Sequence, residues 1–155
     1  MYKQHAKRGV TMLEIVIVIS ILALLSSVVM TSFSKYRNNN LLILNTENLV
    51  SLITKARADT FFSKNDDVYG IRIESGRAVL FKGGIFGEPN ADNIEITFDS
   101  QITASDISLN GGGSDIIFQR LSGKTDHYGT ITMSIVSGDT QNVVHIYETG
   151  LVDVN

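Results

Sequence analysis

The longest uninterrupted apolar pattern in the chain lies close to its N-terminus. Residues 15–33 form 19 consecutive positions without a charged side chain. As an α-helix that rises about 1.5 Å per residue, this run would be roughly 28 Å long, close to the thickness of the hydrocarbon layer of a bilayer. Its Ser and Thr hydroxyls can hydrogen-bond to the preceding helical turn, so they are compatible with insertion. The pattern therefore predicts a transmembrane helix over residues 10–34.

Helical spacing continues beyond this run. No Pro or Gly occurs between residues 38 and 62. The apolar positions that recur at helical spacing are Leu42, Leu49, Ile53 and Ala56. We expect an amphipathic, extracytoplasmic helix over residues 35–63. Asn38–Asn40 is poor helix-forming sequence, so it is either part of one long helix or a flexible joint, and a separate helix could instead begin at Leu41–Leu44.

Beyond residue 63 the apolar positions alternate with polar ones. The alternation at 69–74, the Ser75-Gly76 turn and the apolar run 78–81 predict a hairpin. Further strands are expected at 94–98, 102–109, 115–118, 130–136, 143–147 and 151–154, separated by Gly-rich turns. A helix followed by strands predicts an α+β fold, in which an antiparallel β-sheet domain over residues 64–155 packs on the second half of the helix.

Charge is distributed unevenly along the chain. The net charge is −3, but Lys3, Lys7 and Arg8 precede the apolar run, and the remainder has 10 basic and 16 acidic side chains, a net of −6. Basic residues on the short N-terminal side place the N-terminus of a membrane helix in the cytoplasm. An acidic domain repels phosphate backbones, so we expect no nucleic-acid partner. The chain has no Cys, which excludes disulfides.

Hydropathy alone leaves three other interpretations of the N-terminal segment. A secretory signal peptide would need a small-residue cleavage site after the apolar run, where Ser32-Phe33-Ser34 is a poor version of one. A signal anchor that is never processed fits the hydropathy fully, and a buried core helix fits its apolar character. None of the three explains Glu14, a carboxylate at the start of an apolar helix, which costs about 2.5–3.5 kcal/mol if it lies deep in a bilayer.

The residues around Glu14 carry a resemblance to a known family. Arg8-Gly9-Val10-Thr11-Met12-Leu13-Glu14, followed by the apolar run, resembles the prepilin signature of type IV pilins and type II secretion pseudopilins. The resemblance implies that a membrane-bound prepilin peptidase cuts between Gly9 and Val10 and methylates the Val10 amine. Residues 1–9 would then be a leader, and the apolar helix would stay in the mature protein.

The same resemblance assigns a role to Glu14. In a filament it would pair with the Val10 amine of a neighbouring subunit and fix the axial register between apolar helices. The chain departs from the usual signature in having Val10 where Phe is common and Met12-Leu13 where Leu-Ile is common. It also has no Pro midway along the helix, which fits a minor subunit at least as well as a major one.

The C-terminal part also carries a resemblance. Short motifs at 53–59, 118–123, 129–131 and 146–152 resemble those of H-type minor pseudopilins and related minor pilins. The resemblance implies a pilin-like fold whose partners are other pilin or pseudopilin subunits.

Other motifs give weak indications of chemistry. Ser122-Gly123-Lys124-Thr125 ends like a phosphate-binding loop but lacks the earlier Gly and a following helix. His5, His127 and His145 have no zinc-ligand spacing. Asp66, Asp67 and Asp139 could contribute to a Ca²⁺ site but supply too few oxygens. We therefore expect neither a cofactor nor a metal, and no enzymatic activity.

These observations predict a minor pilin or pseudopilin. It would be a single-pass protein of the cytoplasmic membrane with an extracytoplasmic domain, and would later enter a filament in the periplasm or at the cell surface. Two alternatives stay open: a DNA-uptake minor pilin, and a signal-anchored domain that does not polymerise. The sequence leaves open which machine the filament serves and where in it the subunit lies.

Overall fold

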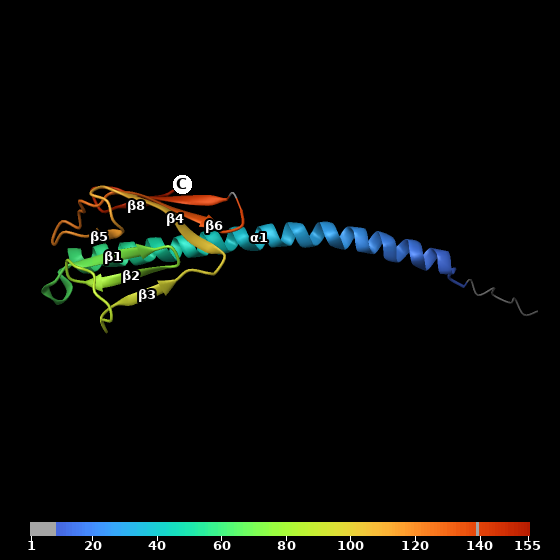
Figure 1. Ribbon diagram of the computed structural model, residues 1–155, viewed down its shortest axis with the longest axis horizontal. Coiled ribbons are helices and arrows are strands. Elements are labelled where there is room, and N and C mark those ends of the chain that lie inside the picture. The colour runs from blue at the N-terminus through green and yellow to red at the C-terminus, as the bar shows by residue number, and fades with distance from the viewer. Residues whose placement is uncertain (1–8, 139) are drawn as a thin grey trace, which may run out of the picture. The chain divides into compact units, whose positions relative to one another are not determined.

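The computed structural model of the protein describes residues 9–138 and 140–155, excepting the side chains of residues 28–32 and 64 (Figure 1). A long helix, α1 (Met12–Phe61), is followed by a 3₁₀ turn, η1 (Lys64–Asp66). The strands are β1 (Tyr69–Glu74), β2 (Arg77–Lys82), β3 (Ile94–Thr97), β4 (Ile102–Leu109), β5 (Asp115–Ile117), β6 (Gly129–Ile135), β7 (Gln141–Ile146) and β8 (Val152–Val154).

The chain divides into two compact units, one ending at Arg37 and one formed by Asn38–Asn155. Helix α1 contributes to both units. Asn38–Asn40 is helical, so no separate helix begins at Leu41–Leu44. Of the segment 35–63 that we expected to be helical, α1 covers the residues as far as Phe61.

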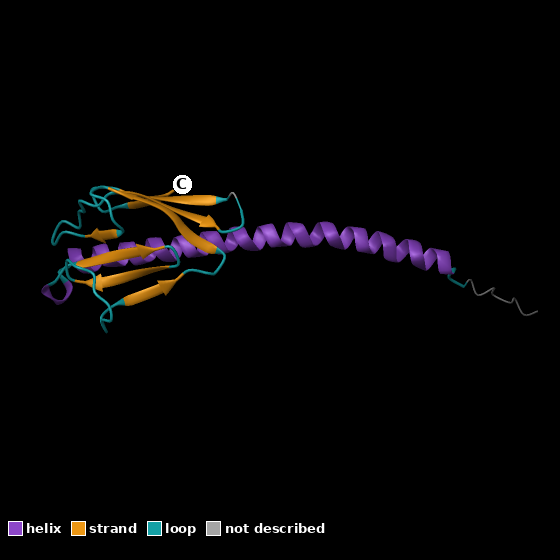
Figure 2. Cartoon of the chain, in the orientation of Figure 1, coloured by secondary structure: helices purple, strands orange, loops and turns teal. Residues whose placement is uncertain are grey.

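In the second unit the strands form two antiparallel sheets, with strand orders β3-β2-β1-β5 and β4-β6-β7-β8 (Figure 2). The predicted hairpin is β1–β2, in which Glu74 pairs with Arg77 across the two-residue turn. The predicted α+β fold is confirmed. Apolar patterning and turn residues located the strands but did not indicate that the strands divide between two sheets.

One face of α1 and both sheets share a single core. The buried helix positions Leu42, Leu49, Leu52, Ile53 and Ala56 pack with strand residues such as Ile71 and Met133. Burying one such Leu or Ile side chain stabilises the fold by about 1.5–3 kcal/mol. The C-terminal part of α1 is therefore the element on which both sheets assemble.

Two polar side chains fix how this helix fits between the sheets. Asn45 and Thr46 are both buried on α1. The Asp99 N–H, between β3 and β4, donates to Asn45 Oδ1 at 3.1 Å. The Asn142 side-chain amide on β7 donates to Thr46 Oγ1 at 3.3 Å. Because a shifted helix would break both bonds to the strands, the two pairs favour one register.

A third polar side chain joins the end of α1 to β1. The Thr60 hydroxyl is fully buried and donates to the Ala56 carbonyl oxygen at 2.9 Å. The Tyr69 N–H donates to the same Oγ1 at 2.8 Å. Between these residues the chain reverses through the left-handed conformations of Ser63, Asn65 and Asp66.

The outer face of β2 is covered as well as its inner face. Val79 and Phe81 are buried although they point away from the core that the sheets share with α1. Phe86, in the loop after β2, packs edge to face on Phe81 with ring centroids 5.4 Å apart, and the Arg72 guanidinium lies 4.3 Å from the Phe86 ring centre. This loop explains why β2 is an apolar run instead of an alternating strand.

Candidate processing and assembly site

The predicted cleavage bond lies just outside the helix. Gly9 and Val10 are non-helical and exposed, with Val10 65% exposed, and α1 begins at Met12. A bond in exposed, non-helical backbone is accessible to a peptidase. The basic leader residues Lys3, Lys7 and Arg8 lie outside the described residues.

Thr11 caps the helix directly after this bond. The Glu14 N–H donates to Thr11 Oγ1 at 3.2 Å. A Thr followed three residues later by Glu is the sequence pattern of a capping box, and such a cap contributes about 1 kcal/mol to helix stability. We did not predict this role of Thr11 from the sequence, although the capping-box pattern was available. The cap makes α1 begin beside the predicted cleavage bond.

Glu14 lies in the first turn of α1 and is exposed. Its predicted partner is the amine that cleavage would create on Val10. The N-terminal turn of a helix carries partial positive charge, which favours a carboxylate at this position even before any partner binds.

The serines of the apolar run form the hydrogen bonds that were expected. Ser20 and Ser26 hydroxyls each donate to a carbonyl four residues earlier at 2.7 Å, and Ser27 donates to the Leu24 carbonyl at 2.8 Å. Thr31 and Ser32 lie outside the residues whose side chains are described. The large apolar side chains between Ile15 and Leu25 are about half exposed or more.

Within the described part of the chain, no helix combines the length and the apolar character needed to cross a membrane. The transmembrane assignment of residues 10–34 stays a prediction.

A second arrangement involves the C-terminal motifs. Arg57 on α1 donates from Nε to the carbonyl oxygens of Gly123 at 3.2 Å and Thr149 at 3.4 Å. The loops carrying these carbonyls are also joined directly, because the Thr125 N–H donates to the Glu148 carbonyl oxygen at 3.0 Å. We call this arrangement the Arg57 clasp. It links the end of α1 to one loop after β5 and another after β7.

Two glycines permit close approach of the backbone near these loops. Gly150 has a φ of +75°, and a Cβ there would lie 2.0 Å from the Gly123 carbonyl oxygen. Gly129 has a φ of +154°, and its Cβ would lie 2.0 Å from the Ser108 carbonyl oxygen. Residues of the three motifs at 53–59, 118–123 and 146–152 thus meet in space, a convergence for which the sequence held no signal.

Those of the remaining sequence candidates that the structure describes do not converge on a catalytic or metal site. Ser122–Thr125 forms a turn followed by β6 instead of a helix. Asp66 pairs with Arg120, and Asp67 pairs with Lys82 at 3.5 Å. His127 and His145 are half-buried, whereas His5 and Asp139 lie outside the described residues. In the part of the chain that the structure describes, no group of three His, Asp or Glu side chains could hold a metal ion.

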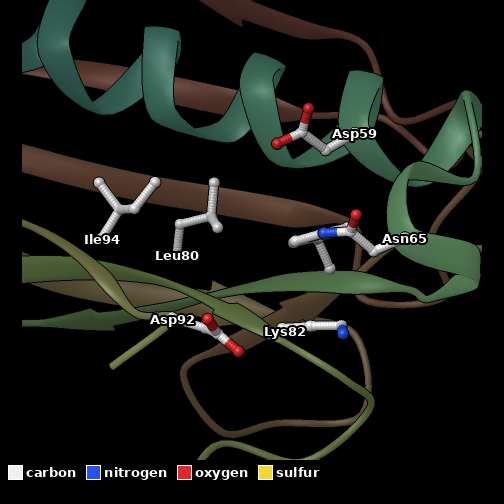
Figure 3. Close-up of a pocket in the computed structure, with 7 residues that line it drawn as sticks. Asp59, Asn65, Leu80, Lys82, Asp92 and Ile94 are labelled. Atoms are coloured by element: carbon white, nitrogen blue, oxygen red, sulfur yellow. The ribbon is translucent and has the colours of Figure 1, made fainter. Parts of the chain in front are cut away.

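One cavity of about 180 Å³ lies beside the end of α1 (Figure 3). It is lined by Asp59, Asn65, Tyr69, Leu80, Lys82, Asp92 and Ile94. Figure 3 shows Asp59 on the helix, with Lys82 and Asp92 across from it. Pockets for drug-sized ligands usually occupy about 300–1,000 Å³, so this cavity is small for such a ligand. None of the predicted processing or assembly residues lines it.

Comparisons with known proteins add one finding. Searches of curated proteins and of solved structures gave no match. A family model described as the prokaryotic N-terminal methylation motif matches residues 4–30. This range includes Gly9, Val10, Thr11 and Glu14, and such a motif implies processing by a prepilin peptidase. The chain therefore carries a prepilin-type N-terminal methylation motif, which supports its relation to the type IV pilins and pseudopilins.

Proposed function

We propose that the protein is a structural subunit of a type IV pilus-like or type II secretion filament. A prepilin peptidase removes residues 1–9 and methylates Val10. The helix over residues 10–34 then anchors the chain in the cytoplasmic membrane with its N-terminus in the cytoplasm. The observation that carries this proposal is the methylation-motif match over residues 4–30, which coincides with an exposed bond and a capped helix start.

Assembly in this proposal buries the apolar surface of the helix between neighbouring subunits. Glu14 pairs with the Val10 amine of the next subunit, because leaving the carboxylate unpaired in an apolar environment costs about 2.5–3.5 kcal/mol. The exposure of Glu14 and Val10 in the single chain is compatible with this pairing. The pair gives a defined register to helices that would otherwise slide along one another.

We further propose that the subunit is a minor one, of the H-type pseudopilin class or a related minor pilin class. The Arg57 clasp supports this assignment, because residues from the quoted motifs at 53–59, 118–123 and 146–152 contact one another there. The domain would face outward and contact partner subunits.

Mass analysis of the mature N-terminus tests the processing step. We expect membranes from cells with a prepilin peptidase to contain a chain that begins at methylated Val10, and peptidase-deficient cells to contain the full-length chain. An intact N-terminus in both strains would favour a plain signal anchor. A cut after the apolar run would make the protein a secreted domain.

Substitution of Glu14 tests the assembly step. Glu14→Ala and Glu14→Gln should both abolish incorporation into filaments, since each removes the charge that pairs with the amine. Glu47→Ala, which removes another exposed carboxylate of α1, is the matched control and should assemble normally. Normal assembly of both Glu14 variants would contradict the proposed register. Tight DNA binding at low salt would instead support a DNA-uptake role.

A further inference from the structure

A ring of aromatic and basic side chains follows the apolar run in the first unit. Phe33 and Tyr36 are each 67% exposed, and Lys35 and Arg37 are exposed beside them. We call these four residues the basic–aromatic ring. No acidic residue is near enough along the helix to neutralise it, because Glu14 is 21 positions before Lys35 and Glu47 is 10 positions after Arg37.

The four side chains cover more than half of the helix circumference. Successive residues of an α-helix are rotated by about 100°. Lys35, Tyr36 and Arg37 therefore point in three widely different directions, with Phe33 pointing close to Arg37. A single protein partner would contact one face of a helix and so only part of this ring. A layer of phospholipid headgroups surrounds a helix completely and would contact all of it.

The position of the ring along the helix matches the thickness of a bilayer. Residues 15–34 form 20 consecutive positions without a charge, between Glu14 and Lys35. At about 1.5 Å per residue this segment is about 30 Å long, equal to the hydrocarbon thickness of a typical bilayer. Charged groups at both ends would then reach the two headgroup layers.

We propose that the basic–aromatic ring binds phospholipid headgroups, preferably anionic ones, at the extracytoplasmic surface of the membrane. The proposal rests on the proposed membrane anchor. Lys35 and Arg37 donate hydrogen bonds to lipid phosphates, Tyr36 lies at the headgroup level, and Phe33 lies toward the acyl chains. The ring fixes the depth of the helix before the subunit enters a filament.

The competing occupant is the domain of a neighbouring subunit. Residues 38–155 contain 8 basic and 15 acidic side chains, a net charge of −7, which would attract the two cations. Such a neighbour would cover the ring only in assembled chains. Lipid headgroups would cover it in isolated chains as well, and this difference allows a test.

The experiment uses tryptophan fluorescence, because the chain has no Trp. The full-length Tyr36→Trp and Leu22→Trp variants are each reconstituted at high dilution in vesicles of equal parts phosphatidylethanolamine and phosphatidylglycerol. Lipids brominated at shallow or deep acyl positions then report the depth of each Trp. We expect deep-position lipids to quench the reporter at 22 most strongly, and shallow-position lipids to quench the reporter at 36 most strongly.

The two reporters separate failure of this inference from failure of the anchor. A reporter at 22 that acrylamide quenches freely from water would overturn the anchor itself. If the reporter at 22 is deep but acrylamide quenches the reporter at 36 at high dilution, the membrane anchor stands. The proposed binding of headgroups by the basic–aromatic ring would then be wrong. Shielding at position 36 that appears only when chains assemble would identify the acidic neighbour as the occupant and overturn the lipid proposal.

Charge removal tests the preference for anionic lipid. The association of spin-labelled phosphatidylglycerol relative to phosphatidylcholine is measured for the wild type, for Lys35→Gln/Arg37→Gln, and for the control Lys55→Gln/Lys124→Gln. Each cation near an anionic surface should contribute about fivefold. The ring variant should lose the preference, and the control should keep it because Lys55 and Lys124 belong to the other unit. An equal loss in both variants would contradict a specific role for the ring.

Discussion

Replacing Thr60 by Val should destabilise the folded domain although the two side chains have nearly the same shape. The Thr60 hydroxyl accepts the hydrogen bond of the Tyr69 N–H at 2.8 Å, and Thr60 is fully buried. Leaving a buried backbone N–H unpaired costs about 1–3 kcal/mol. The added methyl group returns about 0.8 kcal/mol. We therefore expect a net loss of about 0.2–2 kcal/mol in the free energy of unfolding.

Thr46→Val is the matched control for this substitution. Thr46 is buried on the same helix and also donates to the carbonyl four residues earlier, at 2.7 Å. Its other partner is the side-chain amide of half-buried Asn142, which water can reach once the hydroxyl is gone. The loss at position 46 should therefore be smaller, by about 1 kcal/mol.

Urea unfolding of the full chain in mild detergent, followed by circular dichroism, measures both variants. With a denaturant dependence of about 2 kcal/mol per molar urea, Thr60→Val should lower the unfolding midpoint by about 0.1–1 M. Exchange of the Tyr69 amide hydrogen should accelerate in this variant alone. If Thr46→Val were as costly as Thr60→Val, the unpaired Tyr69 N–H would not be the cause and the reasoning would be refuted.

Two further predictions concern the backbone of the domain. Gly129→Ala should destabilise the domain by more than about 3 kcal/mol in thermal unfolding, because the new Cβ would lie 2.0 Å from the Ser108 carbonyl oxygen. The control is Gly84→Ala, where a Cβ would have nothing within 4 Å, and it should change stability by less than about 0.5 kcal/mol. Arg57→Ala should lower the free energy of unfolding by about 1–2 kcal/mol, since two carbonyl oxygens lose their hydrogen-bond donor. The same variant should be cleaved faster by proteases within loops 119–125 and 147–151. Unchanged cleavage of both loops would argue against the Arg57 clasp.

The sequence predicted the elements of this fold well, because their signals are local. Period-two alternation identified β6 closely, since the inward positions of this strand are buried and its outward positions are half-buried. The start of α1 at Met12 could also be predicted from the sequence, because Thr11 and Glu14 form a capping pattern.

Contacts between distant residues were not predictable. The division into two sheets and the Arg57 clasp depend on which distant segments meet, and no local pattern encodes this. Arg57 resembles any other basic residue near a helix end, and its two acceptors are main-chain carbonyls, which every sequence supplies. The left-handed Leu121, with a φ of 64°, was likewise hidden, since β-carbon sterics disfavour that conformation for Leu.

Packing both sheets on α1 has a consequence for the order of folding. The helix is synthesised first, yet Thr46 finds its partner Asn142 only 96 positions later, and β7 and β8 complete the second sheet. Contacts that close such long loops form late, because the entropy of closure must be overcome before the contact stabilises anything. A chain that is still being synthesised would therefore keep the apolar face of Leu49 and Ile53 incompletely covered until its final strands have formed. Chaperones and proteases would have that interval in which to recognise an incompletely folded chain.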